Sequence, residues 1–470
     1  MQKHGIFCPL FSLRSQKSCG IGEFLDLFFL IDFCHEIGFD ILQISPLNDT
    51  GPNDSPFSPI SSCALDPIYL SLHALPDPPL PLTPFVPFNK LTRLDRNAVR
   101  EQKISWLQSY FATHFPTLSK ENSYHQFLSQ NPWLFPYATF KAEHEPQGVD
   151  FHLFLQYLSF SQMKEVRAKA DKANIFLKGD LPFLLPLLSA DLSMYPHLFR
   201  LDQVAGAPPD KYNQNGQKWG FPIYDFEAMR SDGFSWWKKR LEVFENFYHF
   251  YRIDHTLGFF RIWAIPPDKE PQEGSFIPED PTLWPLQGKE ILSKLLSFSS
   301  LKPIAENLGA NAQQVTSQTL KSLGIPGTRV LRWERYDEVG EYIPYHLYDP
   351  LSMTTVSTID LEPVPLWWKN SPQEAFAFAK FKGWEFTPTL SREKHLEILR
   401  DSHHTSSQYH INSLQEYLLI FPELSWPNLE EEQINRAGTI SPTNWTYRFR
   451  PFVEEIVEHA SLKEALINLR

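Results

Sequence analysis

The chain has 470 residues, of which 42% are hydrophobic and 14% aromatic, and this composition excludes a disordered protein. Its 43 basic and 55 acidic residues give a net charge of −12, without a dense Lys/Arg cluster. Nucleic-acid binding is therefore not expected.

The N-terminal region predicts a cytoplasmic protein. Residues 1–10 lack the apolar core of a secretory signal, and no stretch of the chain is long and apolar enough to span a membrane, so we expect no membrane partner. None of the cysteines belongs to a C-x-x-C pair, which favours free buried thiols over disulfides or zinc. The four are Cys8, Cys19, Cys34 and Cys63.

A strand, a helix and a second strand open the chain. We expect the strands over residues 5–11 and 39–47, with a helix over 23–37 that Gly38 ends. This order predicts parallel pairing of the two strands. The polar loop after the second strand carries Asp54 and Phe57 at a strand's carboxyl end, where such folds place functional residues.

The middle of the chain contains a predicted insertion. Residues 76–87 are dense in proline, and residues 97–172 have a helical pattern, so we predict an inserted helical subdomain over 66–172. A buried strand over 173–179 follows and ends beside Asp180. Gly/Pro-rich segments at 204–210 and 215–220, the second with Trp219, are expected to form ordered loops.

The segment from Tyr251 to Trp263 reads as a buried strand that ends in charge. Side chains alternate along a strand, so Arg252 and Asp254 point to the same side, and His255 follows where the strand leaves the core. This layout is typical of a barrel active site, although a structural ion pair gives the same pattern.

Two further acids stand at predicted strand ends. Glu306 lies in a strand over 302–309 and Asp360 ends a strand over 353–360, with another strand over 328–333 between them. A proline-rich loop over 266–285 is suited to cover a cleft. The rest of the chain to about residue 424 is expected to be largely helical, with a probable insertion over 370–430. A closed parallel barrel would bring Asp254, Glu306 and Asp360 to one mouth.

These acids match the chemistry of glycosidic bond cleavage, which needs two carboxyl groups in different protonation states. Arg252 would keep Asp254 ionised as the nucleophile. The apolar neighbours of Glu306 would hold it protonated as the acid. This chemistry requires no metal and no cofactor. The histidines at 403, 404 and 410 are interpreted as a solvated helix face rather than a metal site.

Several motifs in order resemble those of glycoside hydrolase family 77, the 4-alpha-glucanotransferases, along nearly the whole chain. They are FSLRS at 11–15, GIGE at 20–23, QISPLND at 43–49, DSPFS at 54–58, GDLP at 179–182, GAPPD at 206–210, GQKWG at 216–220, RIDH at 252–255, AENLG at 305–309 and GTISPTNW at 438–445. The N-terminal motifs are similar to those of the branch that acts on maltose and soluble glucans.

The resemblance implies a single catalytic domain over 1–470. Its fold would be an α/β class (β/α)₈ TIM barrel with inserted, mainly helical subdomains and no separate C-terminal sheet domain. It also implies transfer of α-1,4-glucan segments to glucose or malto-oligosaccharide acceptors, with malto-oligosaccharides or glycogen-like glucans as partners. In the implied retaining double displacement, Asp254 forms the covalent intermediate, Glu306 acts as acid and then base, and Asp360 holds sugar hydroxyls.

The resemblance also assigns substrate-binding positions. Arg252 and His255 would position the nucleophile and the donor sugar, whereas Asp180, Trp219, Asp54 and Phe57 would line subsites.

The chain departs from the family near the third acid, where Ile359 replaces the usual His, and at Asn307, where Asp is common. Two alternatives stay open. One is an α-glucan hydrolase on the same barrel, because the fold does not fix the acceptor. The other, which the departure at Ile359 suggests, is a glucan-binding relative with impaired catalysis.

Overall fold

The computed structural model describes residues 2–209, 214–309, 312–336 and 341–470. Within these residues, eight parallel strands close into a barrel in the order β1-β12-β11-β10-β9-β6-β3-β2. Their bounds are β1 Lys3–Cys8, β2 Ile41–Ile44, β3 Phe176–Leu181, β6 Phe250–Ile253, β9 Lys302–Ala305, β10 Gly327–Val330, β11 Ser352–Thr355 and β12 Tyr409–Ser413. The expected (β/α)₈ barrel is confirmed.

The barrel closes between its first and last strands. In β1, Lys3 pairs with Tyr409 of β12, and Gly5 pairs with both Ile411 of β12 and Ile41 of β2. β12 lies in the segment that we expected to be largely helical, so that expectation is wrong for residues 409–413. The strand is short and contains polar residues, but it is buried along its whole length because helices cover it.

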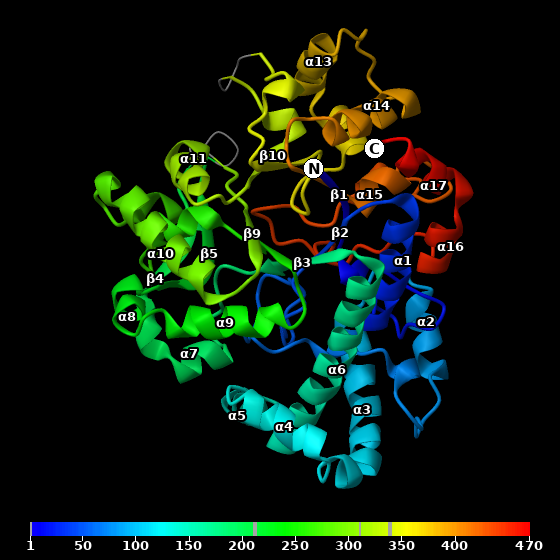
Figure 1. Cartoon of the computed structure of the whole chain (residues 1–470), viewed down its shortest axis with the longest axis vertical. Helices are drawn as coiled ribbons and strands as arrows, with labels where there is room; N and C mark the ends of the chain where they lie inside the picture. The colour runs from blue at the N-terminus through cyan, green and yellow to red at the C-terminus, as the bar shows by residue number, and fades with distance from the viewer. Residues whose placement is uncertain (1, 210–213, 310–311, 337–340) are drawn as a thin grey trace.

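Helices surround the barrel (Figure 1). They include α1 Leu27–Ile37, α9 Ser235–Glu245, α10 Trp284–Phe298, α11 Ala312–Ser322, α12 Val364–Asn370, α13 Pro372–Phe381, α14 Arg392–His403, α15 Leu414–Leu418, α16 Val453–Glu458 and α17 Ala460–Ile467. Across the described residues, no helix is both long and apolar enough to cross a membrane. All four cysteines are free and buried, as expected.

A group of helices is inserted between β2 and β3. They are α2 Val86–Asn89, α3 Arg96–Leu118, α4 Asn122–Gln130, α5 Leu134–His144 and α6 Val149–Ala173. In Figure 1, α3 to α6 extend together away from the barrel strands. Aromatic side chains form their core, and the Phe154 ring packs edge-on against Phe111 and Phe115.

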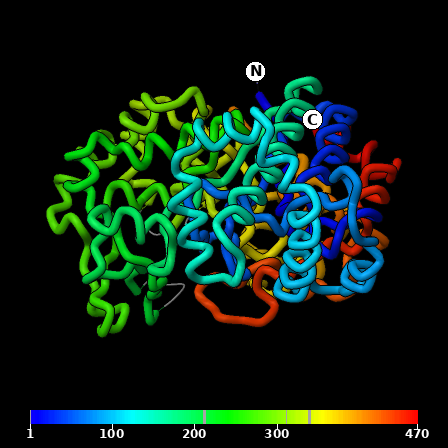
Figure 2. The backbone as a smooth tube through the Cα atoms, turned by 90° about the horizontal axis from the view of Figure 1, so that it is seen from below, coloured from blue at the N-terminus to red at the C-terminus, as the bar shows by residue number. Residues whose placement is uncertain are grey.

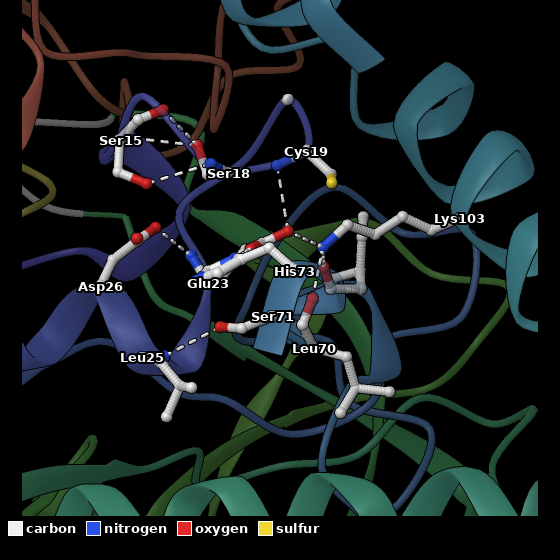
Figure 3. Close-up of polar contacts among 12 residues, drawn as sticks. Ser15, Ser18, Cys19, Glu23, Leu25, Asp26, Leu70, Ser71, His73 and Lys103 are labelled. Carbon is white, nitrogen blue, oxygen red and sulfur yellow. Dashed lines mark hydrogen bonds and ion pairs between the residues drawn. The ribbon is translucent and has the colours of Figure 1, made fainter. Parts of the chain in front are cut away.

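Lys103 ties helix α3 to the barrel (Figure 3). Its Nζ donates to Glu23 Oε1 at 2.5 Å and to the carbonyl oxygens of Ile68 at 2.7 Å and Leu70 at 2.8 Å. Glu23 also accepts a hydrogen bond from the Cys19 backbone N–H. Lys103 and Glu23 are fully buried, so this ion pair is screened little by water.

Replacing Lys103 with Met should therefore destabilise the protein by about 3–5 kcal/mol, because Glu23 would stay buried without the ammonium group, with only His73 Nδ1, among the described residues, at 3.6 Å from its Oε2. Urea denaturation measures the free energy of unfolding. The control is Lys169→Met, which breaks the half-exposed ion pair with Asp32 and should cost no more than about 1 kcal/mol. Equal losses in the two variants would contradict the anchoring role of Lys103.

Two further insertions, one between β3 and β6 and one between β6 and β9, together form a sheet. In the described chain, β4 Phe199–Ala207, β5 Gln217–Tyr224, β7 Ile262–Ile265 and β8 Ser275–Ile277 form an antiparallel sheet in the order β5-β4-β7-β8. Three of the predicted loops are wrong where these strands run. They are the ordered loops at 204–210 and 215–220 and the covering loop over 266–285. Gly206, which suggested a turn, serves close strand pairing instead. A Cβ on Gly206 would meet the Gln217 carbonyl oxygen at 2.1 Å.

Candidate active site

Three adjacent barrel strands bring the predicted charged residues to one edge. Asp180 in β3 is in register with Arg252 in β6, and Ile253 of β6 pairs with Ala305 of β9. Asp254 and Glu306 directly follow β6 and β9, so they leave the barrel at the same carboxyl edge. Parallel strands place such positions side by side, as the sequence predicted.

Arg252 bridges the carboxylates at this edge. Its Nη1 donates to Asp180 Oδ1 at 2.9 Å, to Asp180 Oδ2 at 3.1 Å and to Asp254 Oδ1 at 2.9 Å. Its Nη2 lies 3.8 Å from Glu306 Oε2. The guanidinium therefore fixes the relative positions of the nucleophile and acid candidates.

Asp254 is held at both oxygens. Arg252 binds Oδ1, and the backbone N–H of Phe183 donates to Oδ2 at 3.2 Å. Gly258 allows this arrangement, because a Cβ there would meet the Phe183 ring at 2.4 Å. The carboxylate is thus oriented before any substrate arrives.

Glu306 is a largely buried acid with a raised pKa. Its Oε2 accepts from the His255 backbone N–H and its Oε1 from that of Leu308, both at 2.9 Å. Desolvation by burial outweighs these bonds and the nearby Arg252, and raises the pKa of Glu306 to about 7. A carboxyl group with this pKa can still donate a proton at neutral pH.

His255 shapes the turn between the two acids. Its φ of 43° lies in the left-handed region, which is uncommon for a residue other than glycine, and its N–H faces Glu306. Burial lowers the pKa of His255 to about 4, so the imidazole is neutral. The Trp219 ring stands edge-on to it with centroids 4.9 Å apart. Trp219 comes from β5, so the inserted sheet forms a wall of the site.

Asp360 reaches the site from a turn rather than from a strand end. β11 ends at Thr355, so the predicted strand over 353–360 is too long. Asn435 Nδ2 donates to Asp360 Oδ1 at 2.6 Å, and burial raises the pKa of Asp360. Ile359 is buried beside it. The sequence reasoning missed Asn435, because it lies outside the motifs and has no distinctive spacing.

The loop after β2 carries two candidate residues, Phe57 and Asp54, of which Phe57 contacts the site. The Phe57 ring lies 5.6 Å from Arg252 Cζ and 5.7 Å from the Trp445 ring. Asp54 is exposed and, in the part of the chain described, forms no hydrogen bond or ion pair with Arg252 or the other site residues. Asp210, which ends the GAPPD motif, lies outside the described residues.

The polypeptide between Asn435 and Trp445 projects from the body of the molecule as the orange-red loop in Figure 2. Ile440, in the middle of this segment, is fully exposed. Both ends of this segment contact site residues, because Asn435 binds Asp360 and Trp445 packs on Phe57.

The predicted solvated helix face is wrong for His403 and His410, whereas His404, at the C-terminal end of α14, is exposed. His403 and His410 are buried together with His4, and His403 Nδ1 lies 2.9 Å from His4 Nδ1. The interpretation failed because His410 belongs to β12 rather than to a helix. Among the described residues, no group of three or more His, Cys, Asp or Glu side chains could hold a metal ion.

The barrel and this edge define the class of the protein. They describe a (β/α)₈ barrel in which one arginine lies between an oriented carboxylate and a largely buried acid at the carboxyl edge of the strands, where enzymes of this fold place their active sites.

Comparisons with known proteins identify the family. The profile of the 4-alpha-glucanotransferase family matches residues 8–148 and 141–454. The chain is 41% identical to the 4-alpha-glucanotransferase of Chlamydia muridarum over 503 residues, which cover 99% of this chain and 95% of the relative. It is 42% identical to that of Chlamydia pneumoniae over 501 residues, with coverage of 97% and 93%.

The fold is similar to that of an amylomaltase from Streptococcus agalactiae in complex with acarbose. The TM-score is 0.85 at 23% identity, and the match covers 100% of this chain and 98% of that one. The chain belongs to glycoside hydrolase family 77, the 4-alpha-glucanotransferases. These relatives support transfer over hydrolysis as its activity.

Proposed function

We propose that the chain moves α-1,4-glucan segments between malto-oligosaccharides by a retaining double displacement at the edge formed by β3, β6 and β9. The observation that carries this proposal is the Arg252 bridge. One guanidinium orients Asp254 and lies beside Glu306, an acid whose pKa of about 7 suits proton transfer.

In the first displacement, Asp254 Oδ attacks the anomeric carbon of the donor while Glu306 gives its proton to the glycosidic oxygen. The bond from the anomeric carbon to that oxygen breaks, and a glycosyl ester to Asp254 forms. The hydrogen bonds that Asp254 accepts from Arg252 and Phe183 support its role as the nucleophile, since they hold the attacking carboxylate in one orientation.

In the second displacement, the ionised Glu306 takes the proton of an acceptor hydroxyl, which attacks the anomeric carbon and releases Asp254. Asp360 binds sugar hydroxyls and, with Asp180, adds negative potential around the developing oxocarbenium charge. Trp219 and His255 supply an aromatic and a neutral polar surface for the donor sugar. Phe57 and Asp54 line a neighbouring subsite from the loop after β2.

The replacement at position 359 is compatible with this activity. The buried Ile359 donates no side-chain hydrogen bond, but Asn435 supplies a donor to Asp360. Asp360 is thereby kept in place without the imidazole that the family usually carries. A cytoplasmic location, and glucans rather than nucleic acids or membranes as partners, belong to the same proposal.

Incubation with maltotriose tests the proposal. We expect a ladder of longer malto-oligosaccharides together with glucose or maltose, because a glycosyl ester that meets a sugar hydroxyl is transferred rather than hydrolysed. Chromatography of the products measures both outcomes. Release of short sugars without longer products would contradict transfer. Binding of maltotriose without any turnover would indicate a relative with impaired catalysis.

A further inference from the structure

Lys178 is a buried lysine that the proposed chemistry does not use. It lies two residues before Asp180 in β3, so both side chains point to the same side of the strand. Its Nζ donates to Gln43 Oε1 of β2 at 2.9 Å and to Met353 Sδ of β11 at 3.1 Å. β2 neighbours β3, whereas β11 lies across the barrel, so the ammonium group occupies the lumen beneath the site.

Neither of these two partners carries a negative charge, and Lys178 is 0% exposed. Burying a cation in this way opposes folding. Lys103 offers a contrast in the same protein, because it is equally buried but is paired with Glu23. Burial lowers the pKa of Lys178 to about 7, so its ammonium group is charged below this pH. Among the described residues, the charged groups that act on Lys178 are Asp180, which favours its charge, and Arg252, which opposes it. Stability alone therefore does not account for a lysine at this position.

We propose that Lys178 is a positioning residue for glucan transfer: its charge keeps Asp180 ionised, and Asp180 thereby holds Arg252 against Asp254 and Glu306. The inference rests on the proposed function and extends the site one layer deeper into the barrel. Lys178 touches no substrate in this role.

Lys178 and Asp180 share one face of β3, and hydrogen bonds link Asp180 through Arg252 to Asp254. Both carboxylate oxygens of Asp180 accept hydrogen bonds from Arg252 Nη1, and the same nitrogen donates to Asp254 Oδ1. Burial raises the pKa of Asp180, whereas Lys178 and Arg252 both lower it. Without Lys178, Asp180 would take up a proton more readily. A protonated Asp180 binds a guanidinium less strongly, so Arg252 would lose its fixed position.

Lys178→Met keeps the length of the side chain but removes its charge. We expect kcat for maltotriose disproportionation at pH 6 to fall several-fold, because the pKa of Asp180, which burial already raises to about 6, would rise further. KM should change little, since Lys178 does not contact the sugar. The acid limb of the pH profile of kcat/KM should move to higher pH. The thermal unfolding midpoint should stay equal or rise, because an unpaired buried charge is removed.

A double-mutant cycle with Asp180→Asn makes the test specific. If Lys178 acts through Asp180, adding Lys178→Met to the Asp180→Asn enzyme should have no further effect on kcat. Additive losses would overturn the proposal, and so would wild-type kcat and pH profile in Lys178→Met. The Lys178→Met/Gln43→Leu variant removes both members of the Lys178–Gln43 hydrogen bond, so no buried acceptor is left unpaired there, and kcat should still be low.

The proposed function can fail separately. If the wild-type enzyme does not elongate maltotriose, the proposed function is refuted. The positioning role of Lys178 would then be tested by a crystal structure alone. We expect a crystal structure of Lys178→Met to show Arg252 Nη1 withdrawn from Asp180. An unchanged Arg252 contact would overturn the positioning role.

Discussion

Asp254→Asn should abolish glucan transfer, lowering kcat on maltotriose by roughly 10⁴-fold or more. The amide nitrogen and oxygen of Asn fill the same space, but the amide is a poor nucleophile and forms no glycosyl ester. Product chromatography from maltotriose measures the loss. Calorimetry should show that maltotriose still binds within about tenfold of the wild-type affinity, since the substituted atom acts mainly in the transition state.

Asp202→Asn is a matched control for this variant. Asp202 is an exposed residue of β4 that pairs with Arg200, and its replacement should leave kcat unchanged. Transfer by Asp254→Asn at a rate near that of the wild type would remove Asp254 from the role of nucleophile.

Glu306→Gln should lower kcat by roughly 10²–10⁴-fold, because Gln neither protonates the leaving oxygen nor deprotonates the acceptor. In the wild-type enzyme, the activity should fall as the pH rises through about 7, where Glu306 loses the proton needed for the first displacement. This alkaline limb should be absent from the variant. The pH profile of kcat/KM, measured from pH 5 to 9, checks both expectations.

A donor with a fluoride leaving group separates the two acids, because fluoride departs without a proton. Glu306→Gln should regain the first displacement with maltosyl fluoride, whereas Asp254→Asn should not. Rescue of both variants, or of neither, would contradict the assigned roles.

The parts of the site that sequence reasoning found share one physical basis. β6 and β9 are short apolar runs that end directly in charged residues, and the alternation of side chains along a strand fixes which residues share a face. The parallel barrel then brings Asp180, Arg252, Asp254 and Glu306 together without further information. Local pattern and overall fold agree at these positions.

The missed elements depend on contacts between distant segments. β12 has too few apolar residues to be recognised, and only its place between β1 and β11 makes it a strand. β4 and β5 contain glycines, and their pairing has register shifts. The sequence of either strand alone therefore resembles a turn, and only the paired strand shows that it is not one. Asn435 meets Asp360 across 75 positions of sequence, a contact that no local motif encodes.

The closure of the barrel by β1 and β12 also constrains how the protein is made. β1 can pair with β2 soon after both leave the ribosome, but its other edge finds its partner only when residues 409–413 appear. Synthesis of the roughly 400 intervening residues takes on the order of tens of seconds at typical translation rates.

During that interval the nascent chain carries an incomplete sheet with a free edge, which is a template for wrong pairing. We therefore expect the nascent chain to depend on chaperones until residues 409–413 have left the ribosome.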